Sequence, residues 1–351
     1  MRRQLIFMLP ILAMIGGYLG LTKYEVSYNS KDGFSAKPRA VAAPVATKGT
    51  LPPVRPGDTI RIATFNIQVF GEHKLADART ADVLARIIRK FDVVAIQEIR
   101  AKDPNFMARF MQMVNAGGFH YDCVVGPRLG RTDSKEQYAY IFDLTRVEID
   151  RTSIYTVADP DDLLHREPYV AGFRARAAPP QEAFTFVLID IHTDPDEAQD
   201  ELNALDDVFR AVRNDGRGED DVILLGDLNA GPSLSTPFNL TTARRTQAPG
   251  YDDSHLGQLG ALPYIQYVVS GVPTNTRGTE TYDNILFDRR ATTEYTGTAG
   301  VLDVMREFNL TMDQALLVSD HLPVWAEFSV YEGGRPGNVA VNPQQPVGVG
   351  R

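Results

Sequence analysis

Residues 60–99 decide the fold. The stretch opens with IRIATFNI (60–67), in which apolar and polar residues alternate as in a strand, and closes with DVVAIQEI (92–99), which has the composition of a short buried strand. Between them, ARTADVLARIIRKF (78–91) places its large apolar residues along one stripe of a helix. The stretch therefore predicts a strand–helix–strand unit whose helix packs against a sheet.

The same pattern recurs further along the chain. AFTFVLIDIHT (183–193) predicts a strand, residues 195–212 carry a helical apolar stripe, and DVILLGDLN (221–229) predicts another buried strand. The strand-like stretches YAYIFD (138–143) and LPVWAEFSV (322–330) lie outside the two units and indicate a mixed strand order. Two such units predict an α/β fold with sheets covered by helices.

The two ends of the chain differ from its middle. Two arginines, Arg2 and Arg3, precede an apolar run from Leu5 to Leu21, which is typical of an export signal or membrane anchor. The expected segments are a signal peptide or N-terminal membrane anchor at 1–22, a Pro/Ala-rich linker at 23–57, one folded domain at 58–331 and a disordered tail at 332–351. We expect an exported protein, either secreted or anchored by its N-terminal segment with the folded domain outside the cytoplasm.

The composition suits a folded domain of the size of an enzyme. Hydrophobic residues make up 43% of the 351 residues, which argues against disorder in the middle of the chain. The net charge of -9 disfavours binding of polyanions by bulk electrostatics, so a nucleic-acid substrate would require divalent cations and a local basic patch. Cys123 is the only cysteine, which excludes an intramolecular disulfide and a thiolate-rich zinc site.

Polar residues of related chemistry stand where the apolar strands end. They are Asn66, Glu98, His192, Asp227, Asn229, Tyr282, Asp283, Asp320 and His321. A single motif such as GDLN is most often a turn after a strand, and a lone histidine is most often structural. Because ligands bind at the rims of open sheets, the joint occurrence of these residues predicts one site at such a rim.

The residue types fit hydrolysis of a phosphodiester. This reaction needs charge neutralisation on the phosphate, activation of water and protonation of the leaving oxygen. Glu98 is the leading candidate ligand for Mg²⁺ or Mn²⁺, and oxygen-bearing neighbours that can bind metal or orient water and phosphate are Asn66, Asp227, Asn229 and Asp320.

Two histidines suit the proton transfers. His192 and His321 end apolar strands, and an imidazole gives or takes a proton near neutral pH. Each needs a carboxylate that fixes its tautomer, and Glu136 and Asp283 are available in nearby motifs. The sequence leaves the pairing open. The remaining histidines, which lie in loop-like stretches and are expected at the surface, are His73, His120, His165 and His255.

Longer stretches around these residues resemble the endonuclease/exonuclease/phosphatase superfamily, and within it deoxyribonuclease I most. The resemblance covers residues 59–330 and includes FNIQVFGE (65–72), GPRLGRTDSKEQYAYIF (126–142), HREPYV (165–170) and EFNLTMDQALLVSDHLPV (307–324). It implies a four-layered α/β sandwich, with two packed mixed β-sheets flanked by helices, as the catalytic domain at 58–331. It also implies an endonuclease that cleaves double-stranded DNA with divalent cations, Mg²⁺ and Ca²⁺.

The resemblance also implies individual roles. Glu98 matches the metal ligand, Glu136 the partner of His192, and Asp283 the partner of His321. We expect the His321 pair to act as general base and the His192 pair as general acid, with the reverse assignment open. The remaining matches are Asn66, Asp227, Asn229, Tyr282 and Asp320 in the phosphate and metal shell, Arg166 as a phosphate contact, Arg131 as a substrate contact, and Asp162 and Glu167 in a calcium loop.

The chain departs from the family pattern at positions that contact DNA in the family. Gln68 stands where the family has an arginine that enters the minor groove, and Ser134 where it has a stacking tyrosine. Both changes predict weaker duplex binding. The family's stabilising disulfide is absent, and a second calcium loop at 273–279 lacks its aspartate.

Three functions stay in competition at this point. The leading one is an exported, metal-dependent DNA endonuclease. The second is a phosphodiesterase of the same superfamily that acts on RNA, nucleotides or phospholipid headgroups, and the third is a catalytically idle binding module at the cell surface. DNA is the expected partner, together with the membrane or secretion machinery that would handle the N-terminal segment; no protein partner is predicted and a monomer is expected.

Overall fold

The computed structural model describes residues 24–29, 33–38, 57–177, 179–231 and 253–334. The chain divides into two compact units, residues 1–48 and 49–351. In the first, β1 (Tyr24–Asn29) and β2 (Gly33–Pro38) form an antiparallel hairpin inside the segment expected as a linker. The expected membrane segment at 1–22 lies outside the described residues, as does most of the expected tail.

None of the helices in the described ranges is long and apolar enough to span a membrane.

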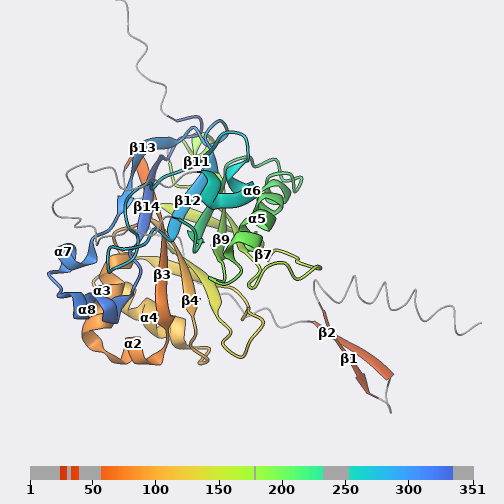
Figure 1. Ribbon diagram of the computed structural model, residues 1–351, viewed down its shortest axis with the longest axis horizontal. Helices are drawn as coiled ribbons and strands as arrows, with labels where there is room; N and C mark the ends of the chain where they lie inside the picture. Colours follow the sequence, from red (N-terminus) through yellow and green to blue (C-terminus); the bar gives the residue numbers. More distant parts are fainter. Residues whose placement is uncertain (1–23, 30–32, 39–56, 178, 232–252, 335–351) are drawn as a thin grey trace, which may run out of the picture. The chain divides into compact units, whose positions relative to one another are not determined.

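The second unit contains two six-stranded sheets. The first sheet has the order β13-β14-β3-β4-β6-β5 (Figure 1). Its strands are β3 (Thr59–Phe70), β4 (Val93–Ile99), β5 (Tyr121–Val125), β6 (Gln137–Asp143), β13 (Tyr295–Val301) and β14 (Val324–Ser329). Only the central pair, β3 and β4, is parallel, and the other neighbours are antiparallel. The mixed order expected from the sequence is confirmed.

The second sheet repeats this plan in the order β11-β12-β10-β9-β8-β7. Its strands are β7 (Val147–Thr156), β8 (Tyr169–Ala175), β9 (Thr185–His192), β10 (Val222–Asp227), β11 (Ile265–Tyr267) and β12 (Asp283–Asp288). Again the central pair, β9 and β10, is parallel and its neighbours are antiparallel. Each sheet is therefore built around one of the strand–helix–strand units of the sequence.

Helices cover the outer faces of both sheets. In Figure 1, α2, α3, α4, α7 and α8 lie on one side of the strands and α5 and α6 on the other. Their bounds are α2 Glu72–Ala76, α3 Ala78–Ile88, α4 Phe106–Val114, α5 Ala198–Arg213, α6 Gly257–Gly260, α7 Val304–Phe308 and α8 Met312–Val318, with short 3₁₀ turns at Pro180–Glu182 and Asp253–Leu256. Among the described helices, side-chain caps fix three starts: Asp77 accepts a hydrogen bond from Thr80 N, Asp303 accepts one from Arg306 N, and Thr311 forms a capping box with Gln314.

Three apolar clusters hold the layers together. The middle cluster lies between the sheets and joins residues such as Tyr140 of β6 to Phe186 of β9. A second cluster packs the helices around α3 on the first sheet, and a third packs α5 and α6 on the second. Helix, sheet, sheet and helix thus form the four-layered α/β sandwich predicted from the sequence. The same arrangement gathers at one rim the carboxyl ends of the parallel strands and the amino ends of their antiparallel neighbours.

Candidate active site

Two histidine–carboxylate pairs stand at this rim. His192 ends β9, and its Nδ1 lies 2.6 Å from Oε1 of Glu136, the residue just before β6. His321 lies between α8 and β14, and its Nδ1 is 2.9 Å from Oδ2 of Asp283, the first residue of β12. All four side chains are buried. Because each carboxylate holds Nδ1, the Nε2 atom of each imidazole is directed to the same space.

Asp227, the last residue of β10, joins the two pairs. Its Oδ2 lies 3.5 Å from Nε2 of His192 and 3.5 Å from Nε2 of His321. Asn66 of β3 donates a hydrogen bond from Nδ2 to the same oxygen at 2.9 Å. Residues from both sheets therefore converge on one carboxylate oxygen, which only the packing of the two sheets brings about.

The carboxylates stabilise positive charge on both imidazoles. Burial opposes the charged form of His321, but Asp283 and Asp227 outweigh it and raise its pKa to about 10. Glu136, likewise with Asp227, raises the pKa of His192 against the effect of burial. Burial would raise the pKa of Glu136, yet His192 and Arg166 lower it to about 2. In the cation-free protein both pairs are therefore ion pairs near neutral pH.

Glu98 lies beside this cluster in a constrained backbone conformation. Its Oε1 accepts a hydrogen bond from Asn66 Nδ2 at 3.2 Å, and its Oε2 accepts one from Val69 N at 2.8 Å. Glu98 has φ 62° and Val69 has φ 50°, values that side-chain-bearing residues rarely adopt. The pairing registers of β3 with β4 and of β4 with β6 also shift here. Such strain concentrates at functional sites, where the surrounding structure maintains it.

The oxygens around Glu98 fit a hard cation. Oδ1 of Asn66 and Oδ1 of Asp320 are both buried and have no hydrogen-bond partner. Buried polar atoms are nearly always partnered, so two orphaned oxygens near a carboxylate indicate a ligand at this place. Mg²⁺ and Mn²⁺ prefer oxygen donors of this kind. Glu98, Asn66 and Asp320 are therefore suited to hold such an ion, with Asp227 at its edge.

Asn229 and Gly226 shape the turn after β10. Asn229 has φ 44°; its amide donates to Asp227 Oδ1 at 3.1 Å, and its Nδ2 donates to Thr193 O at 2.8 Å. At Gly226, which has φ 152°, an added Cβ would lie 1.9 Å from the carbonyl oxygen of Ile191. Only glycine lets β10 approach β9 this closely, and this approach places Asp227 next to His192.

Two further predicted residues lie at the site. Gln68 donates from Nε2 to Asp320 Oδ2 at 2.7 Å, so it orients this carboxylate. The Tyr282 ring is 5.7 Å from the His321 ring, centroid to centroid. The Asp283 carboxylate is in turn held by Thr274, whose hydroxyl donates to Oδ2 at 2.8 Å. Thr274 was not singled out from the sequence, since a threonine in a loop carries no signal of its own.

Two cations at the site were also missed. Arg100 Nη2 lies 3.3 Å from Glu98 Oε2 and 3.5 Å from Glu136 Oε2. Lys74 Nζ donates to Val318 O at 2.6 Å, and burial lowers its pKa to about 8 although Asp320 and Glu98 oppose this shift. Arg100 follows Glu98 by two positions in the sequence, a proximity that could have identified it.

The other predicted contact residues are Arg166, which borders this cluster, and Arg131, which pairs with acids elsewhere. Arg166 donates from Nε to Glu136 Oε1 at 2.9 Å and is 8% exposed, so it supports Glu136 from within the protein. Arg131 forms ion pairs with Asp162 at 3.1 Å and Glu197 at 2.6 Å. Among the described residues, Asp162 and Glu167 belong to no group of three acidic, histidine or cysteine side chains that converge on one point.

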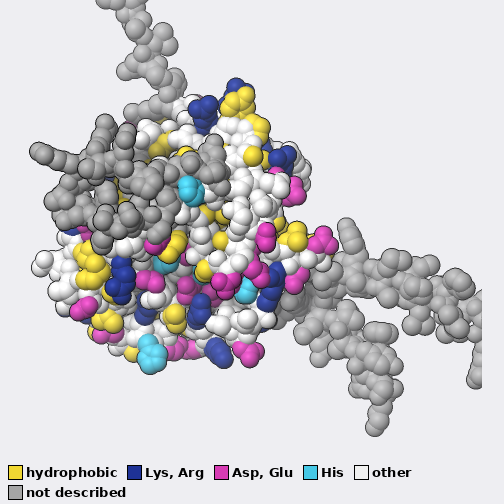
Figure 2. Space-filling model, viewed as in Figure 1, with side chains coloured by type: hydrophobic (Ala, Val, Ile, Leu, Met, Phe, Trp, Pro, Cys, Tyr) yellow, Lys and Arg dark blue, Asp and Glu magenta, His cyan; other side chains and the backbone are white. Residues whose placement is uncertain are grey.

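The remaining histidines take no part in the cluster. His73 and His120 are exposed, and His165 lies 3.5 Å from Asp194 through Nδ1. On the part of the surface described in Figure 2, acidic side chains are interspersed with Lys and Arg, so this face carries no broad basic patch. Positive charge near the site therefore comes from single residues such as Arg100.

A four-layered sandwich with paired histidines and carboxylates at one rim defines a class of phosphoesterases. Residues 63–321 match the Endonuclease/Exonuclease/phosphatase family, and the chain belongs to this family. Curated relatives include "Deoxyribonuclease-1-like 1" of Sus scrofa, 33% identical over 78% of this chain and 82% of that protein. They also include "Deoxyribonuclease-1-like 2" of Homo sapiens, 31% identical over 76% of this chain and 90% of that protein.

Solved structures share the fold at lower identity. A functionally unknown conserved protein from Enterococcus faecalis V583 is 16% identical and matches 76% of this chain and 98% of its own, with a TM-score of 0.50. This likeness supports the α/β sandwich and carries no information on substrate.

Proposed function

We propose that this enzyme is a divalent-metal-dependent deoxyribonuclease that hydrolyses phosphodiester bonds of DNA with a His/His acid–base pair. The observation that carries the proposal is the placement of two imidazole Nε2 atoms at 3.5 Å from one Asp227 oxygen, beside a carboxylate suited to a metal. The relatives of this chain that are named deoxyribonucleases support DNA as the substrate class.

The two histidine pairs carry the proton transfers. Glu136 and Asp283 hold the Nδ1 atoms, so that Nε2 of each ring is the atom that exchanges a proton with the substrate or water. We assign His192 with Glu136 as the acid that protonates the leaving oxygen, and His321 with Asp283 as the base. His321 is protonated in the cation-free protein, so it must lose this proton before it can accept one from the attacking water, and positive charge of a cation held by Asp320 would favour that loss. Asp227, between both Nε2 atoms, orients the two rings and the water.

A metal would be held by Glu98, Asn66 and Asp320. When bound, Mg²⁺ or Mn²⁺ supplies charge neutralisation at the phosphate. Gln68 fixes the Asp320 carboxylate, and the left-handed backbone at Glu98 fixes the other. Arg100 and Lys74 add positive charge beside these acids, which favours an anionic substrate in a protein of net charge -9.

Export of the enzyme remains part of the proposal. It rests on the two arginines and the apolar run that begin the chain. Secretion and anchoring at the membrane differ in whether this segment is removed, and mass spectrometry of the mature protein distinguishes them.

A plasmid-nicking assay tests the activity. Full-length protein is incubated with supercoiled DNA and with Mg²⁺, Mn²⁺ or Ca²⁺ singly and in pairs, beside the Glu98→Gln variant. We expect metal-dependent nicking that the variant lacks. Intact plasmid under all conditions would overturn the assignment to DNA and favour RNA, nucleotide or phospholipid phosphodiesters as substrates. Such substrates would agree with Gln68 and Ser134, which replace two DNA-contacting residues of the family.

A further inference from the structure

A second acidic cluster lies at the end of β10 that is remote from the active site. Asp221 precedes β10, Glu294 precedes β13 and Glu332 follows β14. One carboxylate oxygen from each lies within 4.8 Å of the others. Asp227, at the other end of β10, is six residues from Asp221, so the two clusters are about 20 Å apart at 3.3 Å per strand residue.

Buried oxygens without partners mark this place. Oδ1 of Asp221 and Oε2 of Glu294 have no hydrogen-bond donor, although these residues are only 1% and 2% exposed. The hydroxyl of Thr292, a residue that is 2% exposed, lies next to the Asp221 carboxyl and interacts with it. Since buried polar atoms are nearly always satisfied, the two unpartnered carboxylate oxygens indicate a cation as the ligand of this place.

No basic side chain of the described residues is paired with the three acids. Within the described part of the chain, Asp221, Glu294 and Glu332 form no ion pair with Lys, Arg or His, in contrast to the acids of the active site. Burial, followed by Glu294, raises the pKa of Asp221 to about 8, and burial also raises the pKa values of Glu294 and Glu332.

We propose that Asp221, Glu294, Glu332 and the Thr292 hydroxyl bind one Ca²⁺ ion that fastens the end of the catalytic fold. Ca²⁺ accepts six to eight oxygens at roughly 2.3–2.6 Å in irregular geometry, so ligands on opposite sides of it lie up to about 5 Å apart. Three carboxylates and a hydroxyl that converge on one point suit Ca²⁺, whereas Mg²⁺ usually keeps several waters and binds through one or two carboxylates.

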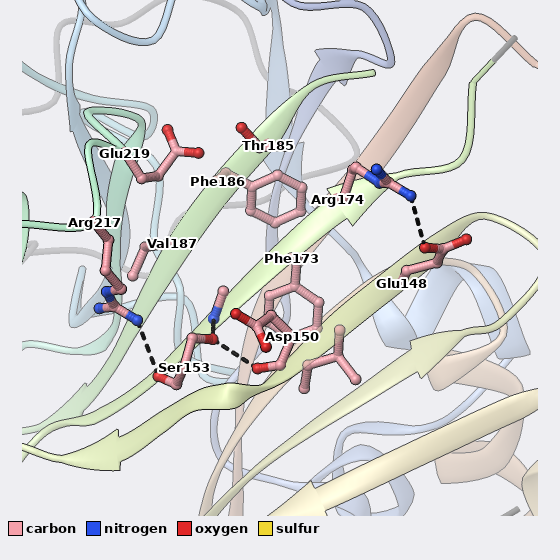
Figure 3. A pocket seen from close by; sticks show the side chains of 12 residues that line it. Glu148, Asp150, Ser153, Phe173, Arg174, Thr185, Phe186, Val187, Arg217 and Glu219 are labelled. Atoms are coloured by element: carbon pink, nitrogen blue, oxygen red, sulfur yellow. Dashed lines mark hydrogen bonds and ion pairs between the residues drawn. The ribbon is translucent and has the colours of Figure 1, made fainter. Parts of the chain in front are cut away.

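A pocket of about 410 Å³ on β7, β8 and β9 lies beside the cluster. Figure 3 shows Glu219 and Thr185 at one end of this pocket. Both touch the cluster through hydrogen bonds: Thr185 N donates to Glu332 Oε2 at 3.2 Å, and Asp221 N donates to Glu219 Oε1 at 3.0 Å. The pocket is also lined by Glu148 and Asp150 and by two arginines, Arg174 and Arg217, of which Arg174 is paired with Glu148 at 3.0 Å.

The position of the site indicates a structural role. Glu332 N donates to Glu182 O, and Phe184 N donates to Val330 O, so the last described segment is bound to the start of β9. An ion held by Asp221, Glu294 and Glu332 would connect three segments that are far apart in sequence. Its binding energy would add directly to the stability of the folded state, because the unfolded chain does not hold these ligands together.

The test uses the full chain with Glu98→Gln, which removes the principal ligand of the active-site metal. Melting temperature is measured after chelation and again with Ca²⁺ or Mg²⁺ added at equal concentration. We expect Ca²⁺ to raise Tm by several degrees and Mg²⁺ to have little effect. Addition of Asp221→Asn abolishes the Ca²⁺ shift, whereas Asp207→Asn, which removes an exposed carboxylate from α5, leaves it intact.

Terbium luminescence gives an independent readout. Tb³⁺ replaces Ca²⁺ at oxygen sites, and its emission is sensitised by aromatic rings of the protein within reach; Tyr295 follows Glu294 in the chain. If Asp221→Asn does not fold, Glu332→Gln serves instead, because its side chain is exposed. In this variant, the ion concentrations needed for half-maximal Tb³⁺ emission and for half of the Ca²⁺ shift in Tm must rise at least tenfold. The proposal is overturned if Ca²⁺ does not raise Tm in the Glu98→Gln protein, or if both cluster variants retain the rise in Tm. The cluster would then be a group of carboxyls that share protons and bind no ion.

Discussion

His192 and His321 approach the same carboxylate oxygen: the Nε2 atom of each lies 3.5 Å from Asp227 Oδ2. His192 lies at the end of a strand of the second sheet, and His321 lies just before a strand of the first sheet. Their Nδ1 atoms contact separate carboxylates, Glu136 and Asp283. This near-symmetric arrangement places two proton-transferring atoms on either side of one small space, which is what an in-line displacement at phosphorus requires.

Removal of either ring should abolish most activity. We expect His192→Ala and His321→Ala each to lower kcat for plasmid nicking by roughly 10²–10⁴-fold, the range for loss of a general acid or base. His73→Ala, an exposed histidine of α2, serves as the matched control. Circular dichroism must show retained folding, and turnover near that of the parent enzyme in either site variant would contradict the mechanism.

The leaving group can tell acid from base. A p-nitrophenyl phosphodiester expels an anion that needs no protonation, so a missing general acid matters little for this substrate. We expect His192→Ala to lose much less activity on this ester than on DNA, and His321→Ala to lose about as much on both. The opposite pattern would exchange the two roles, and equal losses for both variants on both substrates would refute a divided acid–base pair.

Glu98 should control the metal dependence. Glu98→Gln retains the size of the side chain but removes the charge that the metal would meet, and we expect a fall in kcat of roughly 100-fold or more. The Mg²⁺ concentration for half-maximal nicking should also rise. Glu72→Gln, which removes an exposed carboxylate 2.7 Å from Arg109, should change neither quantity. Unchanged metal dependence in Glu98→Gln would exclude this residue as a ligand.

The Glu136–His192 pair should make stability depend on pH at the acid end. The folded-state pKa of Glu136 is lowered to about 2, so its contribution is present above its ordinary pKa of 4.5 and is lost as pH falls towards 2. The difference corresponds to about 3 kcal/mol at most. Urea unfolding in EDTA between pH 5 and 2 should show a smaller loss of stability for Glu136→Gln than for the parent protein; equal slopes would disprove the link.

Gln68 should lower the affinity for duplex DNA relative to an arginine at this position. Replacement by arginine adds a cation beside the site, and we expect Gln68→Arg to tighten binding of duplex DNA and to steepen its salt dependence by about one counterion. Gln258→Arg, at an exposed position of α6, adds the same charge on an outer helix and serves as the control. Binding is measured by fluorescence anisotropy with the inactive Glu98→Gln background, and equal effects of both arginines would argue against a groove contact.

Much of the fold follows from local patterns in the chain. The alternation in residues 60–67, the apolar run 92–99 and the helical stripe between them are short-range features, and β3, α3 and β4 form where they predict. The helix expected at 195–212 is α5, Ala198–Arg213. Polar residues at strand ends also identify the rim, because a residue's place at the end of an apolar strand is visible in the sequence itself.

Partnership between residues was decided by the tertiary structure. Glu136 and His192 are 56 positions apart, and their contact depends on how β6 and β9 of separate sheets are packed against each other. Arg166 contacts Glu136 at 2.9 Å, 30 positions away in the chain, and Arg100, two positions after Glu98, approaches both Glu98 and Glu136.

The sequence by itself determined which elements form and which chemical groups stand at their ends, since propensity and periodicity act over a few neighbouring residues. Only the tertiary structure decided which groups meet: the shared Asp227 oxygen, the left-handed Glu98 and the acids around Asp221. The physical reason is that strand order and sheet packing set distances between residues remote in sequence, and burial then sets their charge.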